Sequence, residues 1–209
     1  MFRPLVRFVT DSRRLASVDT EILRLLPILH KQVFSIDSVI LDLGANRGDF
    51  SKWALKRGAN VYAFEPNGVA VKYIAKRLGN DSRFHLLQMA VSNSNGIQDF
   101  FVHPNSKLDP IGYSIRSSLK QMEQGFYSVN KCLVINILDL FTIFTKIDLI
   151  KIDVEGAEKE IWPILRNHWH QINYLLLEVH DSANPSLRQE MNKFIQDHKL
   201  ESRWSVQWN

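Results

Sequence analysis

Ionisable side chains alternate at the points where two apolar segments of the sequence end. Lys151, Asp153 and Glu155 follow one another with single residues between them, and Glu178 and His180 close a later segment with the same spacing. Because every second residue of a strand faces the same side, each set should share one face. The pattern predicts acidic, basic and cationic groups gathered at two strand ends.

These residue types are suited to removing a proton from an attacking hydroxyl group. A base within hydrogen-bond reach assists such a reaction, and histidine titrates near neutral pH. We therefore predict one set of catalytic residues and one set of substrate contacts. The catalytic set is Asp153, His180, Lys151 and Glu155, and the substrate-binding set includes Glu158 and Glu178.

Structural alternatives exist for several of these residues. Asp153 could cap a helix, Lys151 could pair with a carboxylate, and Glu158 could stabilise a helix start. The aspartate, glutamate and histidine side chains could also bind Mg²⁺, which prefers oxygen ligands. The spacing does not demand a metal ion, and we expect none.

A second motif, residues 39–48, combines a buried strand, a glycine turn and a helix start. Gly44 allows close approach of the backbone to a ligand, and Asp42 at the strand end can pair with a ligand ammonium group or order water around it. A dinucleotide site would require G-x-G-x-x-G, whereas three residues separate Gly44 from Gly48. The motif therefore favours the methionine portion of S-adenosylmethionine over a pyrophosphate.

An acidic residue, Glu65, ends the next apolar segment. A carboxylate at this place can accept hydrogen bonds from both hydroxyl groups of a ribose. Pro66 turns the chain so that its neighbours can lie against an adenine, and Asn67 either joins them or caps the following helix. The glycine turn and Glu65 together predict a nucleoside site.

Continuous apolar strands that alternate with helices predict the fold. They indicate an α/β three-layer sandwich with a mostly parallel, doubly wound sheet, whose ligand lies beyond the carboxyl ends of the strands. Residues 1–36 should form a helical extension, split at Pro27, and residues 37–209 the main domain. The expected strands are 39–43, 60–64, 84–89, 98–102, 133–136, 148–153, 174–179 and 200–206, and the expected helices are 49–56, 69–78, 138–144, 157–165 and about 185–198.

A polar segment without clear periodicity, residues 103–130, separates two of these strands. Long irregular segments inside a domain are usually functional loops or lids. Tyr113, Ser114 and Arg116 could line an acceptor site there, and an ordinary surface loop is the equal alternative.

Composition narrows the class of protein. The 209 residues, 45% of them hydrophobic, suit one soluble domain, and no apolar run is long enough to span a bilayer. A single cysteine, Cys132, and an N-terminus without a secretory pattern lead us to expect a cytoplasmic protein. The net charge of +4 is spread along the chain, so we do not expect nucleic acid as a partner. A homodimer is left open.

Four segments of the sequence resemble the FkbM family of methyltransferases: residues 41–48, 64–67, 90–93 and 150–158. The resemblance implies the class I, Rossmann-like methyltransferase fold and transfer of a methyl group from S-adenosylmethionine to a hydroxyl oxygen, often on a sugar. It implies cofactor contacts from Asp42, Gly44, Asn46, Gly48, Glu65, Asn67 and Ala90. Ala45, Pro66 and Asp153, in the same turn and strand ends, complete the predicted cofactor site.

We therefore expect an S-adenosylmethionine-dependent O-methyltransferase with a small-molecule or glycan acceptor. The sequence pI of about 9.2 keeps an RNA methyltransferase as an alternative. A non-catalytic nucleotide-binding module and a nicotinamide-dependent oxidoreductase are further alternatives, and the missing third glycine counts against the last.

Overall fold

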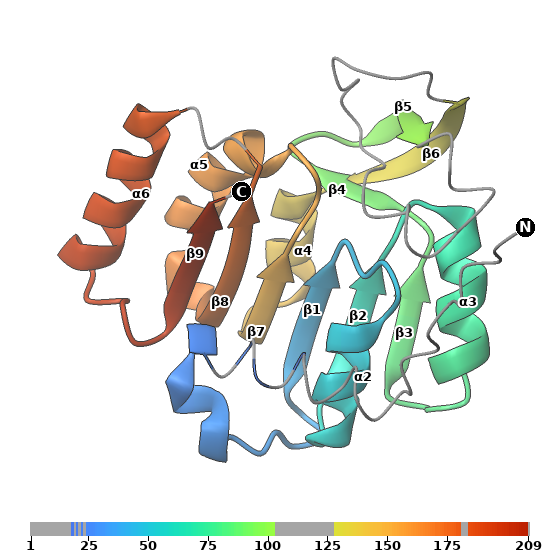
Figure 1. The fold of residues 1–209 in the computed structure, drawn as a ribbon, viewed down its shortest axis with the longest axis horizontal. Coiled ribbons are helices and arrows are strands. Elements are labelled where there is room, and N and C mark those ends of the chain that lie inside the picture. The colour runs from blue at the N-terminus through green and yellow to red at the C-terminus, as the bar shows by residue number, and fades with distance from the viewer. Residues whose placement is uncertain are drawn as a thin grey trace, which may run out of the picture.

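A six-stranded parallel sheet forms the centre of the protein (Figure 1). The computed structural model describes residues 18, 20, 22, 24–102, 128–180 and 184–208. The strand order is β3-β2-β1-β7-β8-β9, so the chain builds outward from β1 in one direction and then from β7 in the other. The bounds are β1 Val39–Leu43, β2 Asn60–Phe64, β3 Phe84–Leu87, β7 Ile147–Ile152, β8 Ile172–Val179 and β9 Trp204–Trp208.

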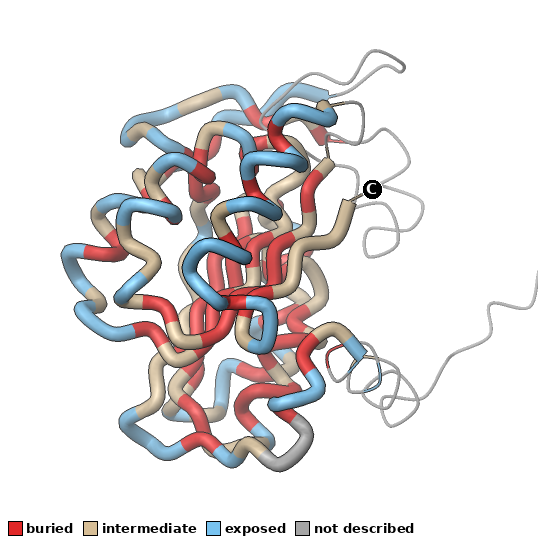
Figure 2. The backbone as a smooth tube through the Cα atoms, turned by 90° about the vertical axis from the view of Figure 1, so that its left-hand side faces the viewer, coloured by how far each residue is buried: buried red, intermediate tan, exposed pale blue. Residues whose placement is uncertain are grey.

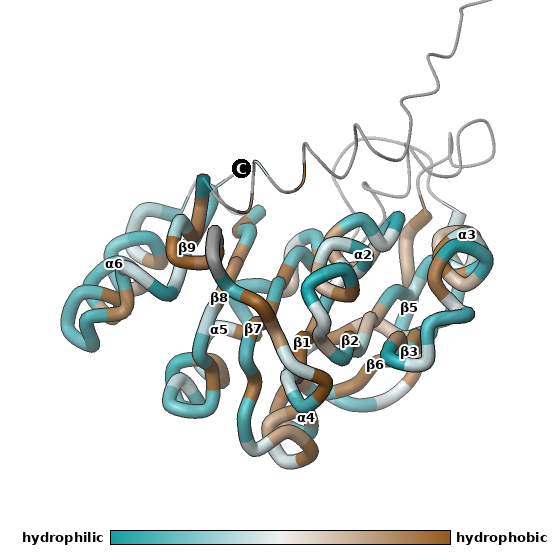
Figure 3. The backbone as a smooth tube through the Cα atoms, turned by 90° about the horizontal axis from the view of Figure 1, so that it is seen from below, coloured by the Kyte–Doolittle hydropathy of each residue, from teal (hydrophilic) through white to brown (hydrophobic). Residues whose placement is uncertain are grey.

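Helices cover both faces of this sheet. The helices α2 (Asp49–Lys56) and α3 (Gly68–Leu78) pack on one face, and α4 (Ile137–Ile143), α5 (Glu158–Asn167) and α6 (Pro185–Asp197) pack on the other. Figure 3, which looks at the molecule from below, shows α2 and α3 on one side of the strands and α4 on the other. Buried backbone is concentrated in the sheet between them (Figure 2). The predicted doubly wound three-layer sandwich is confirmed.

Alternation along the strands sends side chains to two separate cores. Leu41 and Leu43 belong to the cluster beneath α4, α5 and α6, whereas Ile40 belongs to the cluster beneath α2 and α3. Asp42 stands between Leu41 and Leu43 and therefore faces the α2 side. Lys151 is its register partner on β7 and faces the same way. A carboxylate and an ammonium group are thus placed side by side in an otherwise apolar layer.

The N-terminal region packs against the α2 side. Val18, Ile22 and Leu25 are helical, and the 3-10 turn η1 (Pro27–Lys31) follows, so the predicted split at Pro27 is confirmed. Ile22 is buried in the core beneath α2 and α3, together with Leu26 and Leu29. No helix among the described residues is long and apolar enough to cross a membrane.

A small second sheet stands beside the first, with the order β4-β6-β5. Its strands are β4 (Ala90–Ser92), β5 (Gly96–Val102) and β6 (Ser128–Asn136). The prediction of one strand over residues 84–89 was wrong at its end. The chain leaves the main sheet after Leu87, where the amide of Met89 bonds back to the Leu87 carbonyl, and β4 then joins the second sheet. Strand β6 also begins before the expected residue 133, because its first half is exposed and lacks an apolar pattern.

The last strand was predicted too early in the sequence. Leu200 is fully buried, but it lies in the turn after α6, where its amide bonds to the Ile195 carbonyl and Lys199 adopts a φ of 55°. An apolar residue that covers a helix end was mistaken for the start of a strand, and β9 begins at Trp204. The remaining helices and strands agree with the predicted bounds to within two residues, and β1, α2 and β2 agree at both ends.

Candidate functional site

The turn after β1 is bound to the end of β2. The amides of Gly44 and Ala45 both donate to the Phe64 carbonyl at 3.0 Å, and the Gly48 amide donates to the Ala45 carbonyl at 2.7 Å. Gly44, Asn46 and Gly48 have φ values of 80°, 48° and 71°, in the left-handed region that favours glycine or asparagine. The turn therefore depends on the residue types that the sequence places there.

Gly44 also packs directly against the strand that carries the predicted catalytic residues. A Cβ atom built on Gly44 would lie 1.8 Å from the backbone oxygen of Asp153. Gly48 has a different neighbour, because its Cβ would meet Ile74 and Leu78 of α3 at 3.2 Å. The first glycine thus sets the approach of the turn to β7, and the second sets the packing of α3.

Glu65 holds the turn from the β2 side. Its Oε2 accepts the Asn46 amide at 2.7 Å and its Oε1 accepts the Asn67 amide at 2.8 Å, while only 6% of the residue is exposed. Burial raises the pKa of the Glu65 carboxyl to about 7, against the opposing effect of the two amides. Each oxygen retains a lone pair that could accept a further donor.

Lys151 links the turn to the end of β7. Its Nζ donates to the Gly44 carbonyl at 2.9 Å and to Asp153 Oδ2 at 3.1 Å, and lies 3.8 Å from Asp42 Oδ1. Burial lowers the pKa of the Lys151 ammonium, but the charges of Asp153 and Asp42 outweigh it and the pKa is raised. Lys151 is therefore a fixed cation and not a proton acceptor at neutral pH.

Asp42 is fully buried, and its Oδ2 accepts the hydroxyl of Ser51 at 2.5 Å. Burial is the main cause that raises the pKa of this carboxyl. The sequence analysis missed Ser51, although a serine in the first turns of a helix on the side that faces a strand-end aspartate could have signalled this contact. Ser51 and Lys151 fix Asp42 from two sides.

Two buried polar atoms near the turn have no hydrogen-bond partner among the described residues. They are the acceptor Asp42 Oδ1 and the donor Asn67 Nδ2. Buried polar atoms are normally paired, and unpaired ones call for an explanation. An acceptor near the start of the turn and a donor beside Glu65 suit a ligand that carries an ammonium group at one end and a ribose or base at the other. This part of the site fits the predicted nucleoside.

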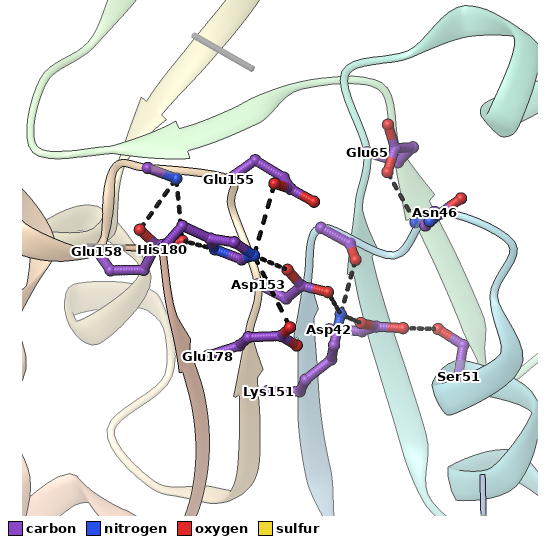
Figure 4. A network of polar contacts seen from close by, with 12 residues as sticks. Asp42, Asn46, Ser51, Glu65, Lys151, Asp153, Glu155, Glu158, Glu178 and His180 are labelled. Atoms are coloured by element: carbon purple, nitrogen blue, oxygen red, sulfur yellow. Dashed lines mark hydrogen bonds and ion pairs between the residues drawn. The ribbon is translucent and has the colours of Figure 1, made fainter. Parts of the chain in front are cut away.

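His180 lies among the carboxylates at the ends of β7 and β8 (Figure 4). Its Nε2 lies 3.5 Å from Glu155, 3.8 Å from Glu178 and 3.9 Å from Asp153. Burial lowers the pKa of His180, but its hydrogen bond to Glu158 and the surrounding carboxylates raise it to about 9. At neutral pH His180 is an imidazolium, which can donate hydrogen bonds but cannot act as a base.

The loop between β7 and α5 presents Glu155 to this cluster. Glu155 has a φ of 53° and Gly156 a φ of 107°, so the backbone is held in the left-handed region here. Strained backbone of this kind persists where the surrounding structure fixes it, frequently at functional sites. Burial raises the pKa of the Glu155 carboxyl to about 7, against the charge of His180. Glu155 can therefore exchange a proton near neutral pH.

Glu158 is placed differently from the other carboxylates. Only 1% of it is exposed, and its oxygens accept the Gly156 amide and bond to His180 Nδ1. It is the first residue of α5 and, like Glu155, does not line the pocket described below. The structure thus brings Lys151, Asp153 and Glu155 together with His180 and Glu178, and sets Glu158 behind them.

Among the described residues, one group has the geometry to hold a metal ion. Ligand atoms of Asp153, Glu155 and His180 lie within 4.8 Å of one another. Carboxylate and imidazole ligands would suit several divalent ions. The predicted catalytic residues and the candidate metal ligands are therefore the same side chains.

A pocket of about 340 Å³ opens beside the turn, on the α2 side of the strand ends. Of the predicted site residues, Ala45, Asn46, Lys151, Asp153 and Glu178 line it, whereas Glu155 and His180 do not. The sequence analysis missed the rest of its wall. The missed lining residues are Val18, Ile22 and Leu25 from the N-terminal helix, Arg47, Asp49 and Phe50 at the start of α2, and Ile152, Leu176, Leu177 and Gln207 from the strands.

The predicted roles of five further residues stay predictions. Tyr113, Ser114 and Arg116 lie outside the described residues, so the predicted acceptor segment stays a prediction. Ala90 is buried at the start of β4, just after the chain leaves β3, and Pro66 lies between Glu65 and Asn67 at the end of β2. Their contact with a cofactor also stays a prediction.

A family model described as the methyltransferase FkbM domain matches residues 42–200 of the sequence. The chain belongs to the FkbM methyltransferase family. The matched range contains the turn, Glu65 and every member of the His180 cluster. The family resemblance read from the four sequence segments is confirmed, and methyl transfer is the activity of the family.

Two curated proteins are similar to this FkbM-family chain. The 2-O-methyltransferase NoeI of Sinorhizobium fredii is 28% identical over 64% of this chain and 61% of its own length. The hexuronic acid methyltransferase AglP of Haloferax volcanii is 23% identical over 78% of this chain and 64% of its own length. The chain thus spans less than two thirds of either relative.

Among solved structures, the FkbM methyltransferase of Methylobacillus flagellatus is similar to this chain. It is 15% identical, and the match covers 79% of this chain and 39% of that protein with a TM-score of 0.45.

Gly44→Ala should destabilise the protein, because the new Cβ would collide with the Asp153 carbonyl and alanine disfavours a φ of 80°. We expect the free energy of unfolding to fall by at least ~2 kcal/mol, measured by urea denaturation followed by circular dichroism. Gly68→Ala is the matched control, because its Cβ would meet only the end of the flexible Gln88 side chain. Equal stability of Gly44→Ala and the wild type would contradict the close contact.

Proposed function

We propose that this chain is an S-adenosylmethionine-dependent O-methyltransferase whose acceptor is a hydroxyl group of a sugar or glycan. The observation that carries the proposal is the link made by Lys151. One ammonium group joins the carbonyl of Gly44 in the nucleoside turn to the carboxylate of Asp153 beside His180. A cofactor site and a proton-accepting site thus share one rigid strand end, as a direct transfer between two bound molecules requires.

The cofactor half of the proposal uses four residues of the turn and its surroundings. Glu65 accepts the ribose hydroxyls on the lone pairs that the two backbone amides leave unused. Asn67 Nδ2 and Asp42 Oδ1, two of the buried atoms without a hydrogen bond among the described residues, supply a donor and an acceptor. Gly44 lets the backbone approach closely. When bound, S-adenosylmethionine supplies an electrophilic methyl group on its sulfonium sulfur.

The acceptor half uses the carboxylates around His180. Asp153 and Glu155 are the groups that can take the proton of the acceptor hydroxyl, and Glu155 has its pKa near 7. His180, charged at neutral pH, donates a hydrogen bond to the acceptor oxygen through Nε2 and orients it. Lys151 binds Asp153 and holds it in place. Glu178 lines the same pocket and contacts the acceptor.

Support for a sugar acceptor comes from the relatives. NoeI is named a 2-O-methyltransferase and AglP a hexuronic acid methyltransferase. The pocket of this chain combines carboxylate, arginine and amide side chains with an apolar wall from the N-terminal helix. Such a mixed lining suits the hydroxyl groups and the apolar ring faces of a carbohydrate.

Asp153→Asn and His180→Ala should each lower kcat by about 10²-fold or more, because each removes a group that contacts the acceptor. The dissociation constant of S-adenosylhomocysteine, measured by calorimetric titration, should stay within about threefold of wild type. Turnover is followed as the mass gain of one methyl group across a panel of sugars, glycolipid precursors and RNA. His170→Ala, an exposed histidine, is the matched control.

Unchanged turnover in both variants would remove the catalytic assignment. Methylation of RNA and of no sugar would show that the acceptor is RNA and not a carbohydrate. Binding of NAD in place of S-adenosylhomocysteine would contradict the assignment of S-adenosylmethionine as the cofactor.

Cofactor binding should weaken in acid because of Glu65. Below its pKa of about 7 the carboxyl is protonated and must lose that proton before it can accept both ribose hydroxyls. The affinity for S-adenosylhomocysteine should therefore be roughly tenfold lower at pH 6 than at pH 8. Glu65→Gln should bind weakly with a flat pH profile. The same pH slope in Glu65→Gln and wild type would show that another group is responsible.

Turnover should not depend on a metal ion. We propose that His180 and Lys151, both cationic at neutral pH, balance the carboxylates at the strand ends. Dialysis against EDTA should change kcat by less than about twofold. A loss of activity that Mg²⁺ or Mn²⁺ restores would instead make Asp153, Glu155 and His180 metal ligands.

A further inference from the structure

Glu158 is a carboxylate that the pocket does not reach but the site depends on. It is 1% exposed, yet its side chain is bound at two places. Both of its oxygens accept the Gly156 amide, at 3.1 and 2.9 Å, and Oε1 lies 3.0 Å from His180 Nδ1 (Figure 4). The sequence predicted that Glu158 binds the substrate, but its oxygens are already occupied by Gly156 and His180, so it is poorly placed to do so.

We propose that Glu158 is a positioning residue that fixes the ring orientation of His180, and through His180 promotes methyl transfer. The proposal rests on the proposed function, because it assigns a role within the same site. It assigns Glu158 a contact inside the protein in place of the substrate contact that the sequence predicted.

The hydrogen bond decides which nitrogen of His180 faces the acceptor. An ionised carboxylate only accepts hydrogen bonds, so His180 Nδ1 must carry a proton where it meets Glu158. The opposite nitrogen, Nε2, then points to Asp153, Glu155 and Glu178 at 3.5 to 3.9 Å, too far for a direct hydrogen bond. This gap leaves Nε2 able to donate a hydrogen bond to the hydroxyl oxygen of the methyl acceptor.

The same carboxylate also holds the loop that carries Glu155. Gly156, whose amide it accepts, has a φ of 107°, and Glu155 before it has a φ of 53°. Glu158 therefore connects the end of β7 to the end of β8, so that His180 and Glu155 keep a fixed separation.

Glu158→Gln tests this role while nearly preserving shape. The amide can still accept the Gly156 amide through its oxygen, but its NH₂ group cannot accept the hydrogen bond that His180 Nδ1 donates in the wild type. We expect kcat to fall by at least about tenfold, as for other partners that orient a functional histidine, with the KM for the acceptor within about threefold. Glu201→Gln, an exposed glutamate, is the matched control and should have no effect.

The proton on His180 Nδ1 supplies a readout that a merely structural residue would not change. In the wild type, the hydrogen bond to Glu158 should give this proton a slowly exchanging signal in the nuclear magnetic resonance spectrum, and Glu158→Gln should abolish it. An unchanged signal would overturn the proposal. Because this measurement needs no acceptor, it decides the role of Glu158 even if the proposed function fails and no hydroxyl compound is methylated.

A double-mutant cycle separates action through His180 from a general loss of structure. If Glu158 acts through His180, adding Glu158→Gln to His180→Ala should lower kcat no further. A loss of kcat in the double variant equal to the product of the two single losses would contradict the proposal. Should Glu158→Gln fail to fold, Glu158→Asp, which keeps the charge on a shorter side chain, replaces it in the same cycle and with the same deciding outcomes.

Discussion

A charged lysine inside a parallel sheet is the constraint on which the rest of the site depends. Lys151 stands on β7 next to β1, at the point where the winding of the sheet reverses. Its ammonium group is within 3.8 Å of Asp42, Asp153 and the Gly44 carbonyl. Removing one partner from such a buried set typically costs about 3–5 kcal/mol, because the remaining charges lose their compensation. The three partners must therefore keep their places together.

This arrangement explains why a turn and a strand end that are distant in sequence act as one unit. Gly44 has no side chain because the Asp153 carbonyl occupies that space, and Asp42 is buried because Ser51 and Lys151 both bind it. The cofactor turn cannot shift relative to Asp153 without breaking these contacts. In the proposed reaction, that rigidity keeps the methyl donor and the acceptor in line.

Negative charge is balanced in a second way at the outer end of the site. Three carboxylates surround His180 Nε2, and a fourth, Glu158, binds Nδ1. The imidazolium that results cannot remove a proton, so in the proposed reaction Asp153 or Glu155 takes it. A histidine that appears to be a base in the sequence is better suited to donate a hydrogen bond in the folded protein.

The sequence predicts the three layers, the parallel and doubly wound sheet, and the gathering of Lys151, Asp153 and His180 at its strand ends, because continuous apolar strands and alternating ionisable residues leave few alternatives. It does not predict β4 or the first half of β6, which are short or exposed and carry no periodic apolar pattern. It also predicts that both Glu155 and Glu158 contact bound molecules, since spacing does not distinguish a carboxylate in a strained loop from one buried behind it. The pocket wall from the N-terminal helix was missed because it depends on contacts between distant residues.

Transfer of an isotopic label tests directly whether this chain methylates a carbohydrate hydroxyl group. The protein is incubated with S-adenosylmethionine carrying a trideuterated methyl group and with a mixture of glycans, and the product is examined by mass spectrometry and NMR. If the chain is an O-methyltransferase for glycans, the label appears as a methyl ether on a carbohydrate oxygen. A label on carbon or nitrogen, or none on any hydroxyl compound while S-adenosylhomocysteine binds, would contradict it.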